Sequence, residues 1–418
     1  MPQNLRPFPA LTLGLAIALS PMTTALAQEP PSREEMWRTI QAQQKQLQAL
    51  TKKLAKTTKK AETTEKKVEA SEERIEATGA MVEQVREASN AQPGWWQKTQ
   101  IGGYGELHYN GGDKEEIDFH RFVLFVGHDF TDSIRFFSEL ELEHSIAGDG
   151  KSGEIELEQA YIEIDFSEFH RTTLGLQMIP IGILNETHEP PTFFGVERNP
   201  IESNIVPSTW WEGGAKFSGE LWEGISYDAM VHSGLETPTT GSSAFKIRNG
   251  RNKVSNASAS DGAYTGRLRW TALPGVEFGV TGQYQSDLTQ GVIDTSATLF
   301  EVHTDVRQGP WGLRALFARW DLRGIAPEAI GRDVQQGWYV EPSYRFQTQI
   351  GEVGVFTRFN EWDNNAGSNG DTQFQQIDFG FNYWPHEDVV LKLDFQVQDA
   401  PAGETEDDRV NLGLGFQF

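Results

Sequence analysis

The 418-residue chain contains no cysteine. This absence excludes disulfide bonds, thiolate metal sites, catalytic thiols and a lipid-modified cysteine anchor. The chain also lacks long hydrophobic runs, since its most apolar stretch, Ala10–Leu19, is much shorter than the roughly 20 residues of a membrane-spanning helix. Positive charge is scarce, because 36 Lys and Arg stand against 60 Asp and Glu, a formal net charge of −24. Nucleic acid is therefore not expected as a partner.

The first 27 residues have the pattern of a secretory signal peptide. Arg6 precedes the apolar stretch, and Ala25-Leu26-Ala27 supplies a small-residue cleavage site, with Gln28 as the expected mature start. We therefore expect an exported protein with a signal peptide over residues 1–27.

Residues 28–94 are predicted to form a helical stalk and linker. This region is nearly neutral, with 12 Lys and Arg against 11 Asp and Glu, and residues 34–90 contain no proline and a single glycine. Apolar residues recur every seventh position from Ile40 to Val82, which is typical of a coiled coil. A solvated single helix or a disordered linker is the alternative interpretation. A coiled coil of this kind is compatible with a trimer.

The last ten residues, 409–418, alternate strictly between apolar and polar or glycine side chains and end on Phe418. Such alternation places the apolar side chains on one face of a strand. A final strand that ends on phenylalanine resembles the sorting signal of bacterial outer-membrane barrels. The apolar face would then contact lipid, and the polar face would line water.

From Thr99 onward, segments of about eight to thirteen residues follow one another, and many of them alternate. We predict sixteen strands: 99–109, 117–128, 133–144, 154–166, 171–178, 211–219, 225–232, 262–272, 276–286, 297–307, 311–320, 336–347, 351–361, 373–383, 389–398 and 408–418. The connections between these strands alternate between short turns and longer loops, as in outer-membrane barrels. The predicted fold class is an all-β transmembrane barrel of sixteen antiparallel strands over residues 95–418, preceded by an α-helical coiled coil.

Alternation also predicts which side chains face lipid and which face the lumen. In strand 389–398, Leu391 and Phe395 are expected to face lipid, whereas Lys392 and Asp394 face the lumen. A barrel of sixteen strands is too wide for its side chains to fill, so an aqueous channel is expected. Seven tryptophans near strand ends are predicted to form interfacial girdles: Trp210, Trp211, Trp270, Trp311, Trp320, Trp338 and Trp384.

Lumen charges are predicted to segregate, with acidic side chains on the third and fourth strands and arginines on later strands. Opposed rows of charge would orient polar solutes. The arginines expected to line the pore are Arg121, Arg135, Arg267, Arg269, Arg314, Arg345 and Arg358. The alternative is that these charges pair with one another and stiffen the wall.

Two long connections carry the remaining candidate residues. The third loop, residues 179–210, is rich in proline and apolar residues, and we expect it to fold into the lumen and narrow it. An outer lid or a clasp between subunits is the alternative. Its charged candidates are Glu186, Glu189, Glu197 and Arg198. The fourth loop, residues 233–261, carries four basic residues that would attract anions if the loop turns toward the mouth, or form a solvated or lipopolysaccharide-facing patch if it stays outside: Lys246, Arg248, Arg251 and Lys253.

Three stretches resemble the phosphate-selective porin O and P family of sixteen-stranded trimeric porins: IDFHRFVLFVGHDF at 117–130, EPPTFFGVERNPIESNIVPSTWW at 189–211 and FKIRNGR at 245–251. The resemblance spans residues 97–418, and the second stretch is its most specific part. It implies a passive channel, a homotrimer, and uptake of phosphate or polyphosphate through basic lumen residues. Arg121, Arg267 and Arg269 are the first candidates for that role.

The function predicted from the sequence is an outer-membrane porin of a Gram-negative bacterium, passing small hydrophilic solutes, with phosphate or other anions preferred. The stalk would lie in the periplasm, where it could brace the trimer or contact peptidoglycan or other envelope partners. Lipid and lipopolysaccharide would surround the barrel. No cofactor and no metal site are expected. A structural tether is one alternative function. An outer-membrane hydrolase is the other, although neither GxSxG nor HExxH occurs in the sequence.

Overall fold

The computed structural model describes residues 94–112 and 114–418, together with seven isolated helical residues between 33 and 52. The chain divides into two units, Met1–Gln92 and Pro93–Phe418. The predicted signal peptide and almost all of the predicted coiled-coil stalk lie outside the described residues, so both stay predictions. Within the described residues, no helix is long and apolar enough to cross a membrane.

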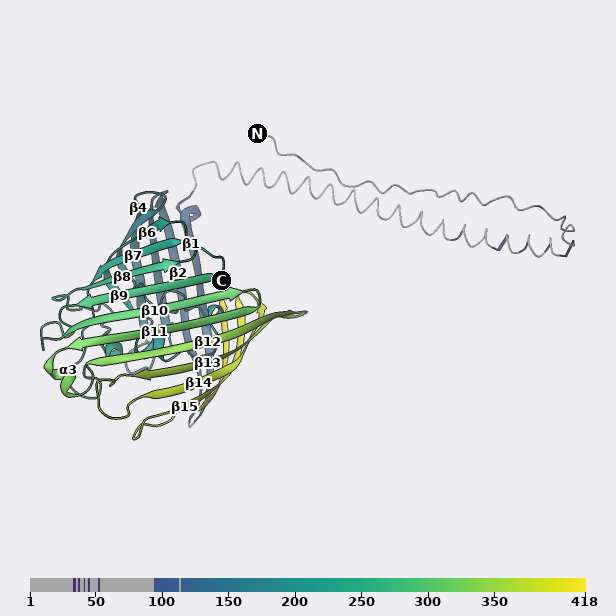
Figure 1. Cartoon of the computed structure of the whole chain (residues 1–418). Helices are drawn as coiled ribbons and strands as arrows, with labels where there is room; N and C mark the ends of the chain where they lie inside the picture. The colour runs from purple at the N-terminus through teal and green to yellow at the C-terminus, as the bar shows by residue number, and fades with distance from the viewer. Residues whose placement is uncertain are drawn as a thin grey trace, which may run out of the picture. The chain divides into compact units, whose positions relative to one another are not determined.

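The second unit is a closed antiparallel barrel, and its described residues form sixteen strands (Figure 1). The strands are β1 (Thr99–Gly111), β2 (Glu115–Thr131), β3 (Ile134–Glu143), β4 (Ile155–Asp165), β5 (His170–Met178), β6 (Trp211–Trp222), β7 (Ile225–His232), β8 (Ala263–Trp270), β9 (Val276–Gln285), β10 (Ser296–Gln308), β11 (Trp311–Arg323), β12 (Val334–Thr348), β13 (Gly351–Asp363), β14 (Phe374–His386), β15 (Val389–Asp399) and β16 (Arg409–Gln417). The predicted number of strands is confirmed, and no predicted boundary is wrong by more than three residues.

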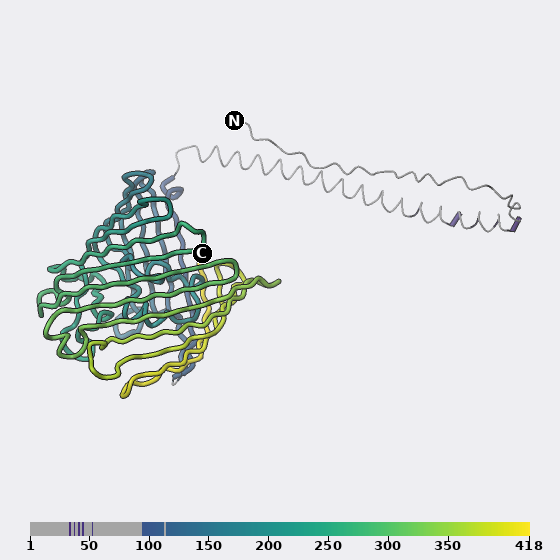
Figure 2. Tube along the Cα trace, in the orientation of Figure 1, coloured from purple at the N-terminus to yellow at the C-terminus, as the bar shows by residue number. Residues whose placement is uncertain are grey.

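Each strand pairs with its neighbours in the sequence, so the chain passes from one strand to the next around the barrel (Figure 2). β1 and β16 close the barrel, with Tyr104 opposite Gln417 and Gly111 opposite Val410. Beyond the last strand, Phe418 exchanges backbone hydrogen bonds with Gly103. The C-terminal strand therefore completes the ring of hydrogen bonds and leaves no free sheet edge.

The two rims of the barrel differ in the length of their connections. At one rim the turns have two to five residues. At the other rim the connections have nine to 32 residues, except the three-residue turn between β1 and β2. Short helices occur near or in these connections: η1 (Trp95–Lys98), η2 (Pro190–Thr192), α2 (Ile201–Asn204), η3 (Ile247–Gly250) and α3 (Ile325–Ala329).

The predicted facing of the strands is confirmed where alternation is strict. On β15, Leu391 and Phe395 are exposed on the outside of the barrel, whereas Lys392 and Asp394 are buried toward the lumen. On β8, Leu268 is 54% exposed and Arg267 only 4% exposed. An apolar outer face of this kind matches a lipid environment, because lipid offers exposed side chains no hydrogen bonds.

The largest cluster of buried apolar side chains lies inside the barrel. It joins residues of the third and fourth loops, such as Ile181 and Phe245, to residues of β10–β13 such as Leu316. The predicted tryptophan girdle is therefore wrong for several members. Trp210 and Trp320 belong to this inner cluster and are fully buried, because Trp320 faces the lumen from β11 and Trp210 ends the third loop inside the barrel. Trp211 and Trp384 are buried too, whereas Trp311 is exposed.

Candidate functional site

The third loop, between β5 and β6, is held together by two buried polar side chains. Asn185 joins the ends of the loop, since its amide donates to the Ile179 and Trp210 carbonyls (2.8 and 3.0 Å) and accepts from the Trp210 N–H (2.7 Å). Glu202 is fully buried, and its carboxylate accepts hydrogen bonds from the backbone N–H groups of Ile183 and Leu184 (2.6 and 2.7 Å). The loop therefore has a defined internal structure.

Lumen-facing side chains from several strands donate hydrogen bonds to backbone carbonyls of the third loop. Arg121 on β2 reaches His188 (3.0 Å), and Arg314 on β11 reaches Thr192 (3.1 Å). Asn382 and Trp384 on β14 reach Phe193 and Pro191 (2.9 and 3.1 Å), and Trp320 on β11 reaches Ile205 (2.9 Å). Because these strands lie on different sides of the barrel, the loop lies within the lumen.

Cavities lie on both sides of the third loop. One of about 220 Å³ is lined by Glu197 and Arg198 of the loop, by basic residues of the fourth loop and by carboxylates of β3 and β4. Two others, of about 670 and 600 Å³, share Glu186, Arg267 and Arg269 and extend to the short-turn rim. We refer to the first as the outer cavity and to the other two as the inner cavities.

Most of the arginines predicted to line the pore are neutralised by carboxylates. Arg121 contacts Glu106 (2.5 Å) and Glu141 (3.9 Å), Arg314 contacts Asp305 (3.0 Å) and Arg345 contacts Glu352 (3.1 Å). The others make two ion pairs each: Arg135 with Glu163 and Asp165, Arg267 with Asp228 and Glu186, and Arg358 with Glu341 and Asp378. The alternative of a wall stiffened by pairs thus describes these six arginines better than a row of free charges.

Arg269 and Arg198 differ from the rest. Among residues 94–112 and 114–418, no carboxylate oxygen lies within 4.0 Å of either guanidinium, whereas each of the six arginines above has at least one such carboxylate partner. Arg269 lines both inner cavities, and Arg198 lines the outer cavity. Each side of the third loop therefore carries one arginine without a carboxylate partner at this distance, and carboxylates line the same cavities.

Three of the four basic residues of the fourth loop turn inward and contact other parts of the barrel. Arg248 donates to the carbonyls of Ser203 and Ser208 (2.6 and 3.0 Å), and Arg251 donates to the carbonyl of Thr209. Lys253 pairs with Glu154 (2.7 Å) and with Glu156. Lys246 does not line the outer cavity, whereas the other three do.

Arg198, Arg248 and Arg251 form a group of like charges in the outer cavity, which we call the arginine cluster. The pKa of Arg248 is lowered to about 9, mainly by burial and to a smaller extent by repulsion from Arg251 and Arg198. Burial and repulsion from Arg198 likewise lower the pKa of Arg251. A bound anion would relieve this repulsion.

The predicted acidic residues of the third loop have different surroundings. Glu186 bridges Arg267 and Lys216, while Glu197 accepts a hydrogen bond from Asn110 (3.0 Å) and pairs with His108 (3.2 Å). Glu189 lines a further cavity of about 380 Å³.

Four residues that make these contacts are not predicted from the sequence as site residues: Glu202, Asp228, Lys216 and His108. Alternation along β1, β6 and β7 could have indicated that the last three face the lumen. No sequence signal identifies Glu202 as the internal anchor of the third loop.

Three comparisons agree with this architecture. The model of a family described as "phosphate-selective porin O and P" matches residues 102–418. An uncharacterized protein of Aquifex aeolicus is 31% identical over 344 residues, which cover 72% of this chain and 76% of that protein.

Solved structures with a similar fold include an anion-selective porin from Comamonas acidovorans, with a TM-score of 0.55 and 12% identity over 77% of this chain and 99% of that one. They also include the trimer form of in-vitro-folded OmpT, an outer membrane protein of Vibrio cholerae, with a TM-score of 0.50 and 10% identity over 77% and 98% of the two chains. At such identities the likeness shows the fold alone.

Proposed function

Since the chain belongs to the phosphate-selective porin O and P family, we propose that it is an outer-membrane porin selective for small anions such as phosphate, with the third loop as its constriction. Solutes would diffuse passively through the water-filled lumen, without chemistry. The Comamonas acidovorans porin of similar fold is described as anion-selective.

The third loop is suited to act as a constriction because it is both rigid and attached on several sides. Its carbonyls accept hydrogen bonds from β2, β11 and β14, and its apolar side chains pack against β10–β13. A permeating solute would therefore pass between this loop and the remaining wall, near β2–β8, where the cavities lie.

The observation that carries the anion preference is the arginine cluster on one side of the third loop, with Arg269 on the other. Guanidinium groups bind phosphate and carboxylate in a planar, bidentate manner, so such groups in a confined lumen would raise the local anion concentration. Carboxylates such as Glu141 and Glu156 line the outer cavity as well. We therefore expect a moderate preference for anions, with residual passage of cations and neutral solutes.

The proposal also covers the oligomeric state of the barrel and its orientation in the membrane. We propose a homotrimer surrounded by lipid and lipopolysaccharide, with the short turns and both ends of the barrel at the periplasmic rim. The similar OmpT structure is described as a trimer form. A periplasmic stalk that tethers the trimer to peptidoglycan depends on residues 28–94, most of which lie outside the described residues.

Removing the free guanidinium groups tests the anion preference. We expect Arg198→Gln and Arg269→Gln each to lower the chloride-to-potassium permeability ratio roughly twofold, because each removes one uncompensated positive charge from the lumen. The ratio follows from reversal potentials of single channels in a salt gradient.

Arg319→Gln is the matched control, since Arg319 lies on β11 beside Asp321 and alternates with the lumen-facing Ala318 and Trp320. Ratios that stay at the wild-type value in both lumen variants would contradict the proposed selectivity.

A further inference from the structure

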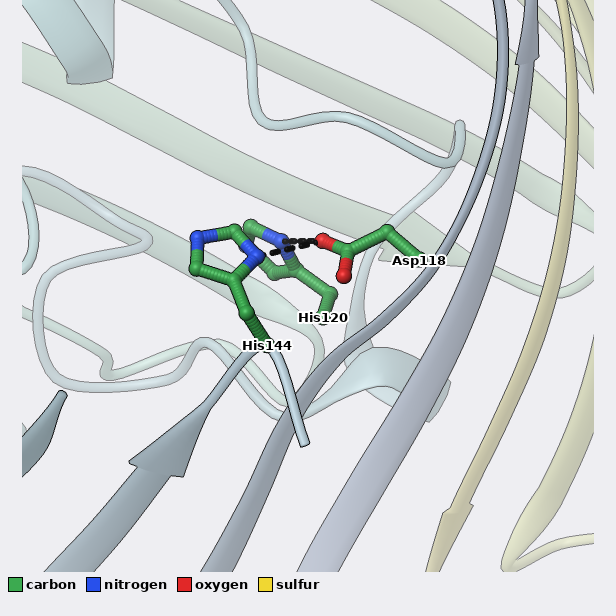
Figure 3. A group of neighbouring side chains, drawn as sticks. All are labelled: Asp118, His120 and His144. Carbon is green, nitrogen blue, oxygen red and sulfur yellow. Dashed lines mark hydrogen bonds and ion pairs between the residues drawn. The ribbon is translucent and has the colours of Figure 1, made fainter. Parts of the chain in front are cut away.

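Three side chains with metal-binding atoms meet at the long-loop end of the barrel, outside the ion pairs described above. They are Asp118 and His120 on β2 and His144, which directly follows β3 (Figure 3). We propose that Asp118, His120 and His144 form a binding site for a divalent transition-metal ion, with zinc as its typical occupant.

The distances fit one shared ion. Asp118 Oδ2 lies 2.7 Å from His144 Nδ1 and 3.3 Å from His120 Nδ1, and both rings point at the same carboxylate (Figure 3). All three ligand atoms lie within 4.8 Å of one another. In a tetrahedral zinc site with bonds of roughly 2.0–2.2 Å, ligand atoms lie about 3.3 Å apart. Small rotations of the rings would therefore suffice for coordination.

An irregularity of β2 produces this arrangement. Arg121 pairs with Glu106 and Asp118 pairs with His108, so Phe119 and His120 together oppose Leu107. This bulge inserts one extra residue, which brings Asp118, His120 and Arg121 to the same side of the strand. Bulges of this kind redirect side chains near functional sites.

His144 also departs from regular strand geometry. Alternation with the lumen-facing Glu141 and Glu143 would turn His144 outward, but its backbone adopts a φ of 53°. This left-handed conformation is unfavourable for residues other than glycine, and surrounding contacts must hold it. Here the His144 N–H donates to the His120 carbonyl (3.0 Å), and the ring reaches Asp118.

The donor set favours a borderline metal ion. Two imidazole nitrogens and one carboxylate oxygen suit Zn²⁺ better than Ca²⁺ or Mg²⁺, which prefer oxygen ligands, and they leave a position for water or a solute. The side chains of Asp118, His120 and His144 are 31%, 32% and 35% exposed, so an ion can enter from the lumen.

The described residues contain three other groups of potential metal ligands, which are less suited to bind a transition-metal ion. Glu139, Glu158 and His188 are almost completely buried and offer a single imidazole nitrogen, and His386, Glu387 and Asp388 are consecutive residues at an exposed turn. Glu141, Glu143 and Glu156 provide only carboxylates.

Zinc binding can be measured directly. The full-length protein in detergent, stripped with EDTA, would be titrated with Zn²⁺ by isothermal titration calorimetry. We expect one saturable site per chain, and affinity roughly 100-fold lower in Asp118→Asn and His144→Gln, because the first replaces the charged carboxylate by a neutral amide and the second removes one imidazole ligand.

His128→Gln is the matched control, because His128 lies on the same strand but contacts Thr99 near the other rim. Heat-modifiable migration on gels checks that each variant is folded. Cobalt in place of zinc supplies a test on the unmodified protein, since histidine ligation gives visible absorption bands.

Absence of a saturable site, or wild-type affinity in both ligand variants, would overturn the proposal. Binding that persists in Asp118→Asn but is lost in His386→Gln would overturn it as well, because the ion would then lie at the exposed turn.

A second measurement tests the effect of zinc on the channel. This effect rests on the proposed porin function, whereas the proposal of a zinc site does not. His120 lines the outer cavity together with Arg198, so a bound dication would add positive charge there. We expect Zn²⁺ to raise the chloride-to-potassium permeability ratio roughly twofold in the wild type and to leave it unchanged in Asp118→Asn. If zinc binds but the ratio does not move, the channel role of the ion is contradicted while the site itself stands.

Discussion

Arg358 contacts Glu341 and Asp378, each at 3.0 Å, and all three side chains are almost completely buried in the lumen wall. At the scale of residues, a buried ion pair affects stability mainly when one partner is removed, because the other partner is then left buried without a counterion. Two buried carboxylates without a counterion are costly, because they have lost water and gained no charge partner. We therefore expect Arg358→Leu to lower the free energy of unfolding by about 3–5 kcal/mol.

Urea unfolding of the barrel in detergent, followed by tryptophan fluorescence, measures this loss. Arg319→Leu is the control, because Arg319 and Asp321 are 40% and 50% exposed and their pair contributes roughly 0–1 kcal/mol. Equal effects of the two substitutions would contradict the assignment of Arg358 to a buried network.

At the scale of elements, the third loop depends on Glu202. One carboxylate oxygen accepts from two backbone N–H groups, and the other accepts from the hydroxyl of Tyr339 (2.9 Å) and the amide of Asn199 (3.0 Å). Glu202→Gln replaces one acceptor oxygen by an NH₂ donor, leaving buried donors unpaired at a cost of about 1–3 kcal/mol. We expect the loop to loosen while the barrel still assembles, because no strand pairing involves Glu202.

The readouts are single-channel conductance, which should rise, and current noise, which should increase through movements of the loop. Glu328→Gln on the exposed face of α3 is the control. A conductance and a noise spectrum equal to those of the wild type would contradict a constricting role for the third loop.

The strands could be predicted from the sequence, whereas the contacts between strands and loops could not. The sixteen strands were predictable because period-two alternation and turn residues are local signals, as in the stretch from Val389 to Phe418. The placement of Trp320 in an inner apolar cluster was not, because it depends on which loop occupies the lumen. The bulge at Phe119 and His120 and the pairing of Arg358 with Asp378 arise from cross-strand register, which no single strand encodes.

At the scale of the whole molecule, the barrel joins an apolar outer face to a charged, water-accessible lumen divided by the third loop. The region from Trp95 onward is strongly acidic, with about 23 Lys and Arg against 49 Asp and Glu. Net charge alone would favour cations, whereas the proposed anion preference depends on the arginine cluster and Arg269 beside the third loop. Charges beside the third loop would act on a solute more strongly than distant charges, which are screened over about 8–10 Å at physiological salt. These nearby charges include the carboxylates that line the outer cavity as well as its arginines.

The most direct test is single-channel recording of the full-length protein in a planar bilayer under a salt gradient. We expect stepwise conductance in groups of three, a reversal potential with the sign of anion preference, and a chloride current reduced by millimolar phosphate. Folded, heat-modifiable protein that gives no current steps would contradict a porin, and a reversal potential of the opposite sign would contradict anion preference.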